Sequence, residues 1–458
     1  MQRDAIDLGK VHIPRLFRIY FIPTLLGMLS LCAVTATDGI FIGRGVGSDG
    51  LAAVNICIPP TMLIMGIGMM LGVGASVVAS IHLANGREKA ARINITQALG
   101  AGTLIVLLFL AVSLASTRAT GFLLGSSEGL IESVCDYMPW IFSCTLPQIW
   151  CAIGLFVVRL DGSPRYAMWC NVLPGLLNVV LDYVFIFPLD MGIRGAGIAT
   201  LISCGVGGLM VITYVTGLAD RLKLIRIKSS AKSIALTLRN LGYQCKIGLS
   251  ALLGEATMGM LMLVGNLMFM HYIGDDGVGA FSIACYYCPF ILMVGNAIAQ
   301  SAQPIISYNF GLGDLRRVAA TERIAIAVAI VCGLLVTSLF VFAPKLLIGL
   351  FLDTHTHTAA IAIAGFPLFS AAFVAYIFNL TAIGYYQSVE RVAPSIIFAL
   401  LRGVVFMVPA FLLMPVVLGT PGMWLALAVS EILTALCITA YYLGNRRRSR
   451  PEQKAPCE

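Results

Sequence analysis

NITQALGAGTLIVLLFLAVSLAST, residues 94–117, contains no charged side chain. At about 1.5 Å of rise per residue, a helix of this length crosses a hydrocarbon core of roughly 30 Å. A helix at the surface of a soluble domain keeps a polar face toward water, and this stretch has none. The stretch therefore predicts a membrane-spanning helix.

Similar apolar stretches recur along the whole chain. The 458 residues are 59% hydrophobic and 11% charged, with a mean hydropathy of +0.92, whereas soluble domains are about half apolar and a quarter charged. We place spans at 17–42, 53–83, 94–117, 133–158, 166–188, 194–217, 246–270, 278–310, 324–349, 359–387, 394–416 and 421–444. The predicted fold class is an all-α integral membrane protein with twelve transmembrane helices.

Lysine and arginine are distributed unevenly between the loops. The chain has 30 of them against 22 acidic residues, a formal net charge of +8. Most lie at the N-terminus, in alternate loops or in the C-terminal tail, and the positive-inside rule assigns these segments to the cytoplasm. The exceptions are Arg44, Arg118, Arg194 and Lys345. We therefore expect a bacterial inner-membrane protein with both termini cytoplasmic, whose positive charge is a topology signal and not a sign of nucleic-acid binding.

The chain repeats itself at an offset of about 227 residues. GSDGLAA (47–53) aligns with GDDGVGA (274–280), GASVVASIHLANG (74–86) with SAQPIISYNFGLG (301–313), and MGIRGAGIA (191–199) with LGTPGMWLA (418–426). Because six is an even number, two six-helix halves enter the membrane from the same side and are related by a pseudo-two-fold axis along the membrane normal. We expect an N-lobe at 1–218, a basic cytoplasmic linker at 219–245, a C-lobe at 246–444 and a basic tail at 445–458.

Four acidic residues lie inside the predicted spans beyond the first turn, where an ionisable side chain is costly and therefore a candidate for function. Counting along each helix from flanking charges places Asp38, Asp182 and Thr200 about 9–12 Å below the outer surface. Asn178 lies one turn deeper than Asp182 on the same helical face. Their oxygen atoms suit a small hard cation, and two close carboxylates would alternatively hold a proton. The alternative is structural: Asp38 as a helix cap, Asn178 and Thr200 as helix–helix contacts.

The other two acids are weaker candidates for contact with substrate or a proton. Glu255 follows Lys246 by nine residues and so lies in the inner half or near the centre of the membrane. Glu431 lies about eleven residues into the last span and is either a second acid of the central cleft or the partner of a polar neighbour. We find no pattern of catalytic residues, so we expect neither an enzyme nor a cofactor, and no metal other than Na⁺.

Four motifs carry a family resemblance: TDGIFIGRGVGSDGLAA (37–53), NVVLD (178–182), GIRGAGIAT (192–200) and QPIISYNFG (303–311). With them, the chain resembles the multidrug and toxic compound extrusion (MATE) family over nearly its full length. The resemblance implies two six-helix lobes and ion-coupled drug efflux by alternating access. In the DinF-like branch it implies a coupling site at Asp38, Asn178, Asp182 and Thr200.

The NorM-like branch of the same family adds acids on the seventh and tenth spans. Glu255 matches the first, but the tenth span carries no acid between Ala371 and Ile383, only Asn379 and Thr381 among its polar groups, so we favour coupling through the N-lobe. The resemblance implies a monomeric antiporter in membrane lipid that exports small organic, often cationic, compounds in exchange for Na⁺ or H⁺. The alternative is a flippase for a lipid-linked saccharide, for which we would expect extra spans and a cationic cleft, whereas we interpret the intramembrane charges here as acidic.

Overall fold

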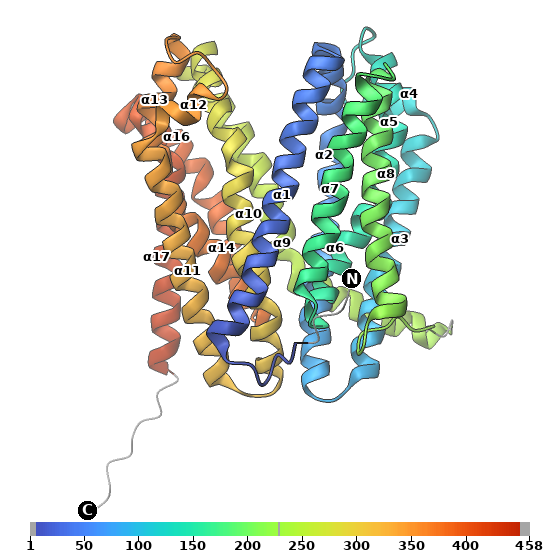
Figure 1. The fold of residues 1–458 in the computed structure, drawn as a ribbon. Coiled ribbons are helices and arrows are strands. Elements are labelled where there is room, and N and C mark those ends of the chain that lie inside the picture. The colour runs from blue at the N-terminus through green and yellow to red at the C-terminus, as the bar shows by residue number, and fades with distance from the viewer. Residues whose placement is uncertain (1–5, 228–229, 449–458) are drawn as a thin grey trace, which may run out of the picture. The chain divides into compact units, whose positions relative to one another are not determined.

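The computed structural model describes residues 6–227 and 230–448, and every regular element in these ranges is a helix (Figure 1). The elements are α1 (Ile13–Gly45), α2 (Ser48–Ala84), α3 (Glu88–Leu114), α4 (Thr117–Leu123), α5 (Ile131–Ser143), α6 (Thr145–Leu160), α7 (Pro164–Ile186), α8 (Gly192–Thr213), the π-helix η1 (Tyr214–Leu218), α9 (Ala231–Tyr272), α10 (Asp275–Gly311), α11 (Leu315–Phe342), α12 (Pro344–Gly349), α13 (His357–Ser370), α14 (Phe373–Ser388), α15 (Val392–Leu400), the π-helix η2 (Leu401–Val405), α16 (Met407–Leu418) and α17 (Thr420–Arg448).

The described helices contain eleven spans that are long and apolar enough to cross a membrane. A twelfth is formed by α13 and α14 together, which are bent by 45° at the break between them. Several spans combine two elements; for example, α5 and α6 form one span at Ile131–Leu160. Each of the twelve predicted spans overlaps one of these, so the predicted fold class is confirmed.

The chain forms two compact units that do not follow the sequence in order. The first holds the residues up to Glu255 together with Asn296–Ala325 and Gly384–Val392, and the second holds most of the remainder. The predicted boundaries of the N-lobe (1–218) and C-lobe (246–444) come from the sequence repeat and stay a prediction. Within the predicted linker at 219–245, α9 begins at Ala231 and continues unbroken into the seventh span, and the bounds of the linker stay a prediction. In the predicted tail at 445–458, α17 extends to Arg448 and the rest lies outside the described residues.

Within the first unit, α2 contacts α10 through residues that the repeat makes equivalent. The Gln303 amide donates to the Ser76 hydroxyl over 3.2 Å, and Ser307 donates to Ser80 over 2.9 Å, each across a sequence separation of 227 residues. That separation is the repeat offset, and equivalent residues of a two-fold arrangement meet each other at its axis. The contacts therefore place a pseudo-two-fold axis between α2 and α10.

Glycines bring α2 and α9 into direct backbone contact. A Cβ atom at Gly248 of α9 would collide with the carbonyl oxygen of Met70, and one at Gly74 of α2 would collide with that of Gln244.

We expect Gly248→Ala to lower the free energy of unfolding by about 1–3 kcal/mol, because the two backbones must separate. Thermal unfolding in detergent measures this. Gly254→Ala is the control on the same helix, because a Cβ there meets no atom within 4 Å; equal melting of the two variants would contradict the prediction.

Candidate cation site and buried charges

Small residues hold α1 close to α7, the two helices that carry Asp38 and Asp182. A Cβ at Gly175 of α7 would lie 2.8 Å from the Val34 side chain, and one at Gly27 of α1 would lie 3.4 Å from the Met168 backbone. Small side chains permit this close approach of helices in a membrane. The acidic residues of the two helices can therefore meet.

An apolar cluster of Ile42, Ile186 and Ala196 sits directly beside the acidic residues. These side chains from α1, α7 and α8 pack together and are almost fully buried. Each lies four residues, about one helical turn, from Asp38, Asp182 and Thr200, respectively, and so on the same face of its helix. The structure thus brings these three predicted site residues into one layer, adjoining a dry apolar layer.

The carboxyl groups of Asp38 and Asp182 lie within hydrogen-bonding reach of each other. Asp182 is fully buried and Asp38 partly so. Within the described residues, both Asp182 oxygens, Oδ1 of Asp38 and the amide nitrogen of buried Asn178 have no hydrogen-bond partner. Buried polar atoms are normally paired, and two adjacent carboxylates repel unless a proton or cation lies between them. The geometry suits either one.

Thr200 completes the predicted set from α8. Its hydroxyl donates to the Ala196 carbonyl over 2.9 Å, which leaves the oxygen lone pairs available as acceptors. Among the described residues, no three His, Cys, Asp or Glu side chains are grouped so as to hold a metal ion. A pair of acids with a hydroxyl and an amide is a set of hard oxygen ligands, which suits Na⁺ better than a transition metal.

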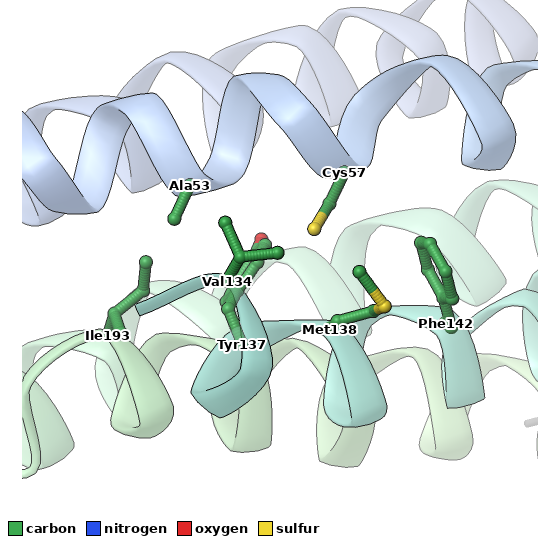
Figure 2. Close-up of a cluster of buried hydrophobic side chains, with 7 residues drawn as sticks. All are labelled: Ala53, Cys57, Val134, Tyr137, Met138, Phe142 and Ile193. Atoms are coloured by element: carbon green, nitrogen blue, oxygen red, sulfur yellow. The ribbon is translucent and has the colours of Figure 1, made fainter. Parts of the chain in front are cut away.

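Tyr137 of α5 is a neighbour of the pair that our sequence analysis missed. It is buried in a cluster that joins α5 to Ala53 and Cys57 of α2 and to Ile193 of α8 (Figure 2). It lies close enough to both Asp38 and Asp182 to interact with their charges. Nothing in the sequence around it identifies it, since a tyrosine in an apolar span usually serves packing alone.

Glu255 remains a separate acid. It is partly buried on α9, and its Cβ would lie 3.9 Å from a Cβ at Gly66 of α2. No described residue forms a hydrogen bond or ion pair with its carboxylate, and the structure does not bring it into contact with Asp38 or Asp182. It stays a prediction as a contact for substrate or a proton.

Glu431 of α17 is held in a buried ion pair. Nε of Arg402 lies 2.7 Å from Oε1 of Glu431, and the amide of Asn379 donates to Oε2 over 2.7 Å and to the Glu431 carbonyl over 2.8 Å. The Arg402 guanidinium lies 3.9 Å from the centre of the Tyr376 ring. Both charged side chains are at most 2% exposed. Of the two interpretations of Glu431, the structure favours the partner of a polar neighbour.

Arg402 also corrects the expectation that the charges inside the spans are acidic. It lies in η2, within the span Val392–Leu418. The apolar residues around it give this span a high hydropathy, so our sequence analysis overlooked the single arginine. A second buried arginine, Arg159, lies in the last turn of α6 and donates to the side-chain oxygen of Gln300 over 2.7 Å. Buried charge in this protein therefore has both signs.

Comparison with known proteins gives the chain a family. The sequence profile of the MatE family matches residues 23–184 and again residues 251–412. The chain belongs to the MatE family. One match falls in each half, in agreement with the internal repeat. As a member of this family, the MATE protein described here is a multi-pass membrane transporter and not an enzyme.

The MATE relatives are distant but match nearly the whole chain. Multidrug export protein MepA of Staphylococcus aureus (strain MRSA252) is 24% identical over 433 residues, which cover 93% of each protein. MepA of Staphylococcus saprophyticus subsp. saprophyticus is 23% identical and covers 97% of this chain and 96% of its own length.

Solved structures share the fold. A multidrug resistance MATE family transporter of the MOP superfamily in an outward-facing conformation gives a TM-score of 0.87 at 20% identity, with 98% of both chains covered. A MOP superfamily transporter from Pyrococcus furiosus Vc1 (DSM3638) gives 0.85 at 21% identity, also with 98% of both chains covered.

Proposed function

We propose that this MATE transporter exports small organic, often cationic, compounds in exchange for Na⁺ or H⁺. The observation that carries the proposal is the pair Asp38–Asp182, in which three buried carboxylate oxygens lack hydrogen-bond donors among the described residues. A site of two acids, Asn178 and Thr200 is chemically suited to take up and release one small cation. The MepA relatives, which are named multidrug export proteins, support export as the direction and organic compounds as the cargo.

Coupling requires that the ion bind one conformation better than the other. Asp38 lies on α1 and Asp182 on α7, so uptake of a proton or cation relieves the repulsion between the two carboxylates and brings these helices closer together. α1 contains Pro23, which removes one backbone hydrogen bond and lets the helix bend. We infer that ion uptake repacks α1 against α7, and that this movement drives alternating access and ejects the substrate.

The setting we propose is a bacterial inner membrane. The basic residues of the loops support a cytoplasmic position for the N-terminus, the α2–α3 turn and the C-terminus. We propose that the transporter acts as a monomer, because one chain supplies both acids of the proposed cation site and needs no residue from a second chain. The ends that carry His82 and Arg159 are then cytoplasmic, and Asp38 lies toward the opposite surface.

The test is transport under one imposed gradient at a time. Everted vesicles from a host without its own drug pumps are given a fluorescent organic cation in the outer medium, and either a Na⁺ or an H⁺ gradient, high inside, is applied. We expect movement of the cation under one of the two gradients and none in vesicles without the protein. Absence of movement under both gradients, across a panel of organic cations, would contradict the proposal.

The flippase alternative gains little from the structure. For a flippase we expected more than twelve spans, whereas the described residues contain eleven helical spans and one bent pair. It also called for a cationic cleft, and the charge of Arg402 is balanced by Glu431. Movement of a fluorescent lipid-linked saccharide in the same vesicles, without movement of organic cations, would favour it.

A further inference from the structure

A pocket of about 360 Å³ lies in the first unit, at the opposite end of the helices from the Asp38–Asp182 pair. Asp38 is near the end of α1, whereas His82 of the pocket is near the end of α2, which runs back from α1 after a short turn. The pocket is lined by the end of α2, the start of α3, α9 and the α14–α15 turn. Its apolar wall consists of Val78 and Ile81 of α2 and Ala90 and Ile93 of α3. Its polar groups are His82, Asn94, Asn240, Tyr243 and Glu390.

Glu390 is the charged group of this pocket and has an unusual backbone. Its φ is 55°, a left-handed conformation that only Asp190 shares among the described non-glycine residues. Such a conformation is strained for a residue with a side chain and persists where the surroundings impose it. The Tyr243 hydroxyl donates to Oε1 of Glu390 over 3.1 Å. Burial raises the pKa of the Glu390 carboxyl above its ordinary value.

The remaining polar groups of the pocket present acceptors. The Asn240 amide nitrogen donates to Gln97 over 3.2 Å, and that of Asn94 donates to the Ala90 carbonyl over 2.9 Å. Each asparagine amide therefore uses one of its two N–H donors within the protein. The side-chain oxygen of Asn94 accepts from the Gln244 amide over 2.8 Å, so only Asn240 has its side-chain oxygen available. Oε2 of Glu390 and the side-chain oxygen of Asn240 have no hydrogen-bond partner among the described residues. The carboxylate of Glu390 beside the aromatic ring of Tyr243 is a pair of groups that favours a cation.

We propose that this pocket binds an alkylammonium group, with the charge on Glu390 and the alkyl part on the valine and isoleucine side chains of α2 and α3. Tyr243 both orients the carboxylate and offers its ring to the cation. Two sources carry this chemistry at this end of the molecule: a soluble organic amine, or the headgroup of an aminophospholipid in the adjacent leaflet. Only the first source rests on the proposed function, in which the amine is an export substrate.

Binding of a dansylated alkylammonium probe to the full chain in phosphatidylglycerol nanodiscs tests the proposal. All proteins carry Asp38→Asn, so that the aspartate pair does not take up the probe. We expect Glu390→Gln to weaken binding at least tenfold, the order of one charge-assisted contact. Tyr243→Phe, which keeps the ring but loses the hydrogen bond to Glu390, should weaken it about threefold. The control Glu88→Gln removes an exposed acid of α3 that does not line the pocket.

The source of the ammonium group follows from a second set of nanodiscs that contain phosphatidylethanolamine. Weaker probe binding there identifies an aminophospholipid as the occupant, and unchanged binding identifies a soluble amine. Glu390→Gln protein that binds as well as its parent, or a matching loss in Glu88→Gln, would overturn the proposal, provided that the variants melt as the parent does. Because no ion gradient is applied, this result is independent of whether Na⁺ or H⁺ drives transport.

Discussion

We expect Asp38→Asn to abolish gradient-driven transport, because Asp38 supplies half of the proposed cation site, while the protein stays folded in the membrane. The substitution replaces one carboxylate of the pair with a neutral amide that can donate to Asp182. A fixed donor then occupies the place where a proton or cation would lie, and the ion no longer distinguishes the two conformations. Stability should be unchanged or higher, because the repulsion between adjacent carboxylates is gone.

Everted vesicles under the gradient that drives the parent protein measure this loss. Asp182→Asn should have the same effect, since either acid alone is half of the pair. Glu132→Gln is the control: this acid lies exposed in the first turn of α5, in the same half of the chain, and should transport normally. Full transport by Asp38→Asn with intact ion dependence would show that coupling occurs elsewhere, and Glu255 would be the next candidate.

Arg402→Met should destabilise the protein by about 3–5 kcal/mol, since it leaves Glu431 charged, buried and without its cation. Asn379 alone would remain beside the carboxylate, and a neutral amide does not balance a charge. Removal of both charges in Arg402→Met/Glu431→Leu should restore most of the lost stability, because an apolar pair avoids the desolvation cost. Thermal and denaturant unfolding in detergent measure all three proteins.

The double variant also decides whether Glu431 contributes to transport. If the ion pair serves only the packing of α14, η2 and α17, the double variant should export as the parent does under the same gradient. A stable double variant without transport would assign Glu431 or Arg402 a direct role. If the double variant is as unstable as Arg402→Met, the uncompensated charge of Glu431 is not the cause of the lost stability.

The spans and the depth of the site residues were predictable from the sequence alone. A bilayer core demands apolar helices of about 20 residues, so every span leaves a long uncharged stretch such as 94–117. Because a helix rises by a constant amount per residue, counting from flanking charges placed Asp38, Asp182 and Thr200 at one depth. The structure places the apolar residues one turn away from each of them, Ile42, Ile186 and Ala196, in one cluster.

What only the tertiary structure decided is which side chains face each other at a given depth. Lipid is as apolar as a protein interior, so the hydrophobic pattern of a membrane helix shows poorly which face meets another helix. The partnership of Arg402 with Glu431, the approach of Tyr137 to the aspartate pair, and the pocket around Glu390 each depend on how different helices face one another. The sequence alone determined how deep each polar group lies, and helix packing determined its partner.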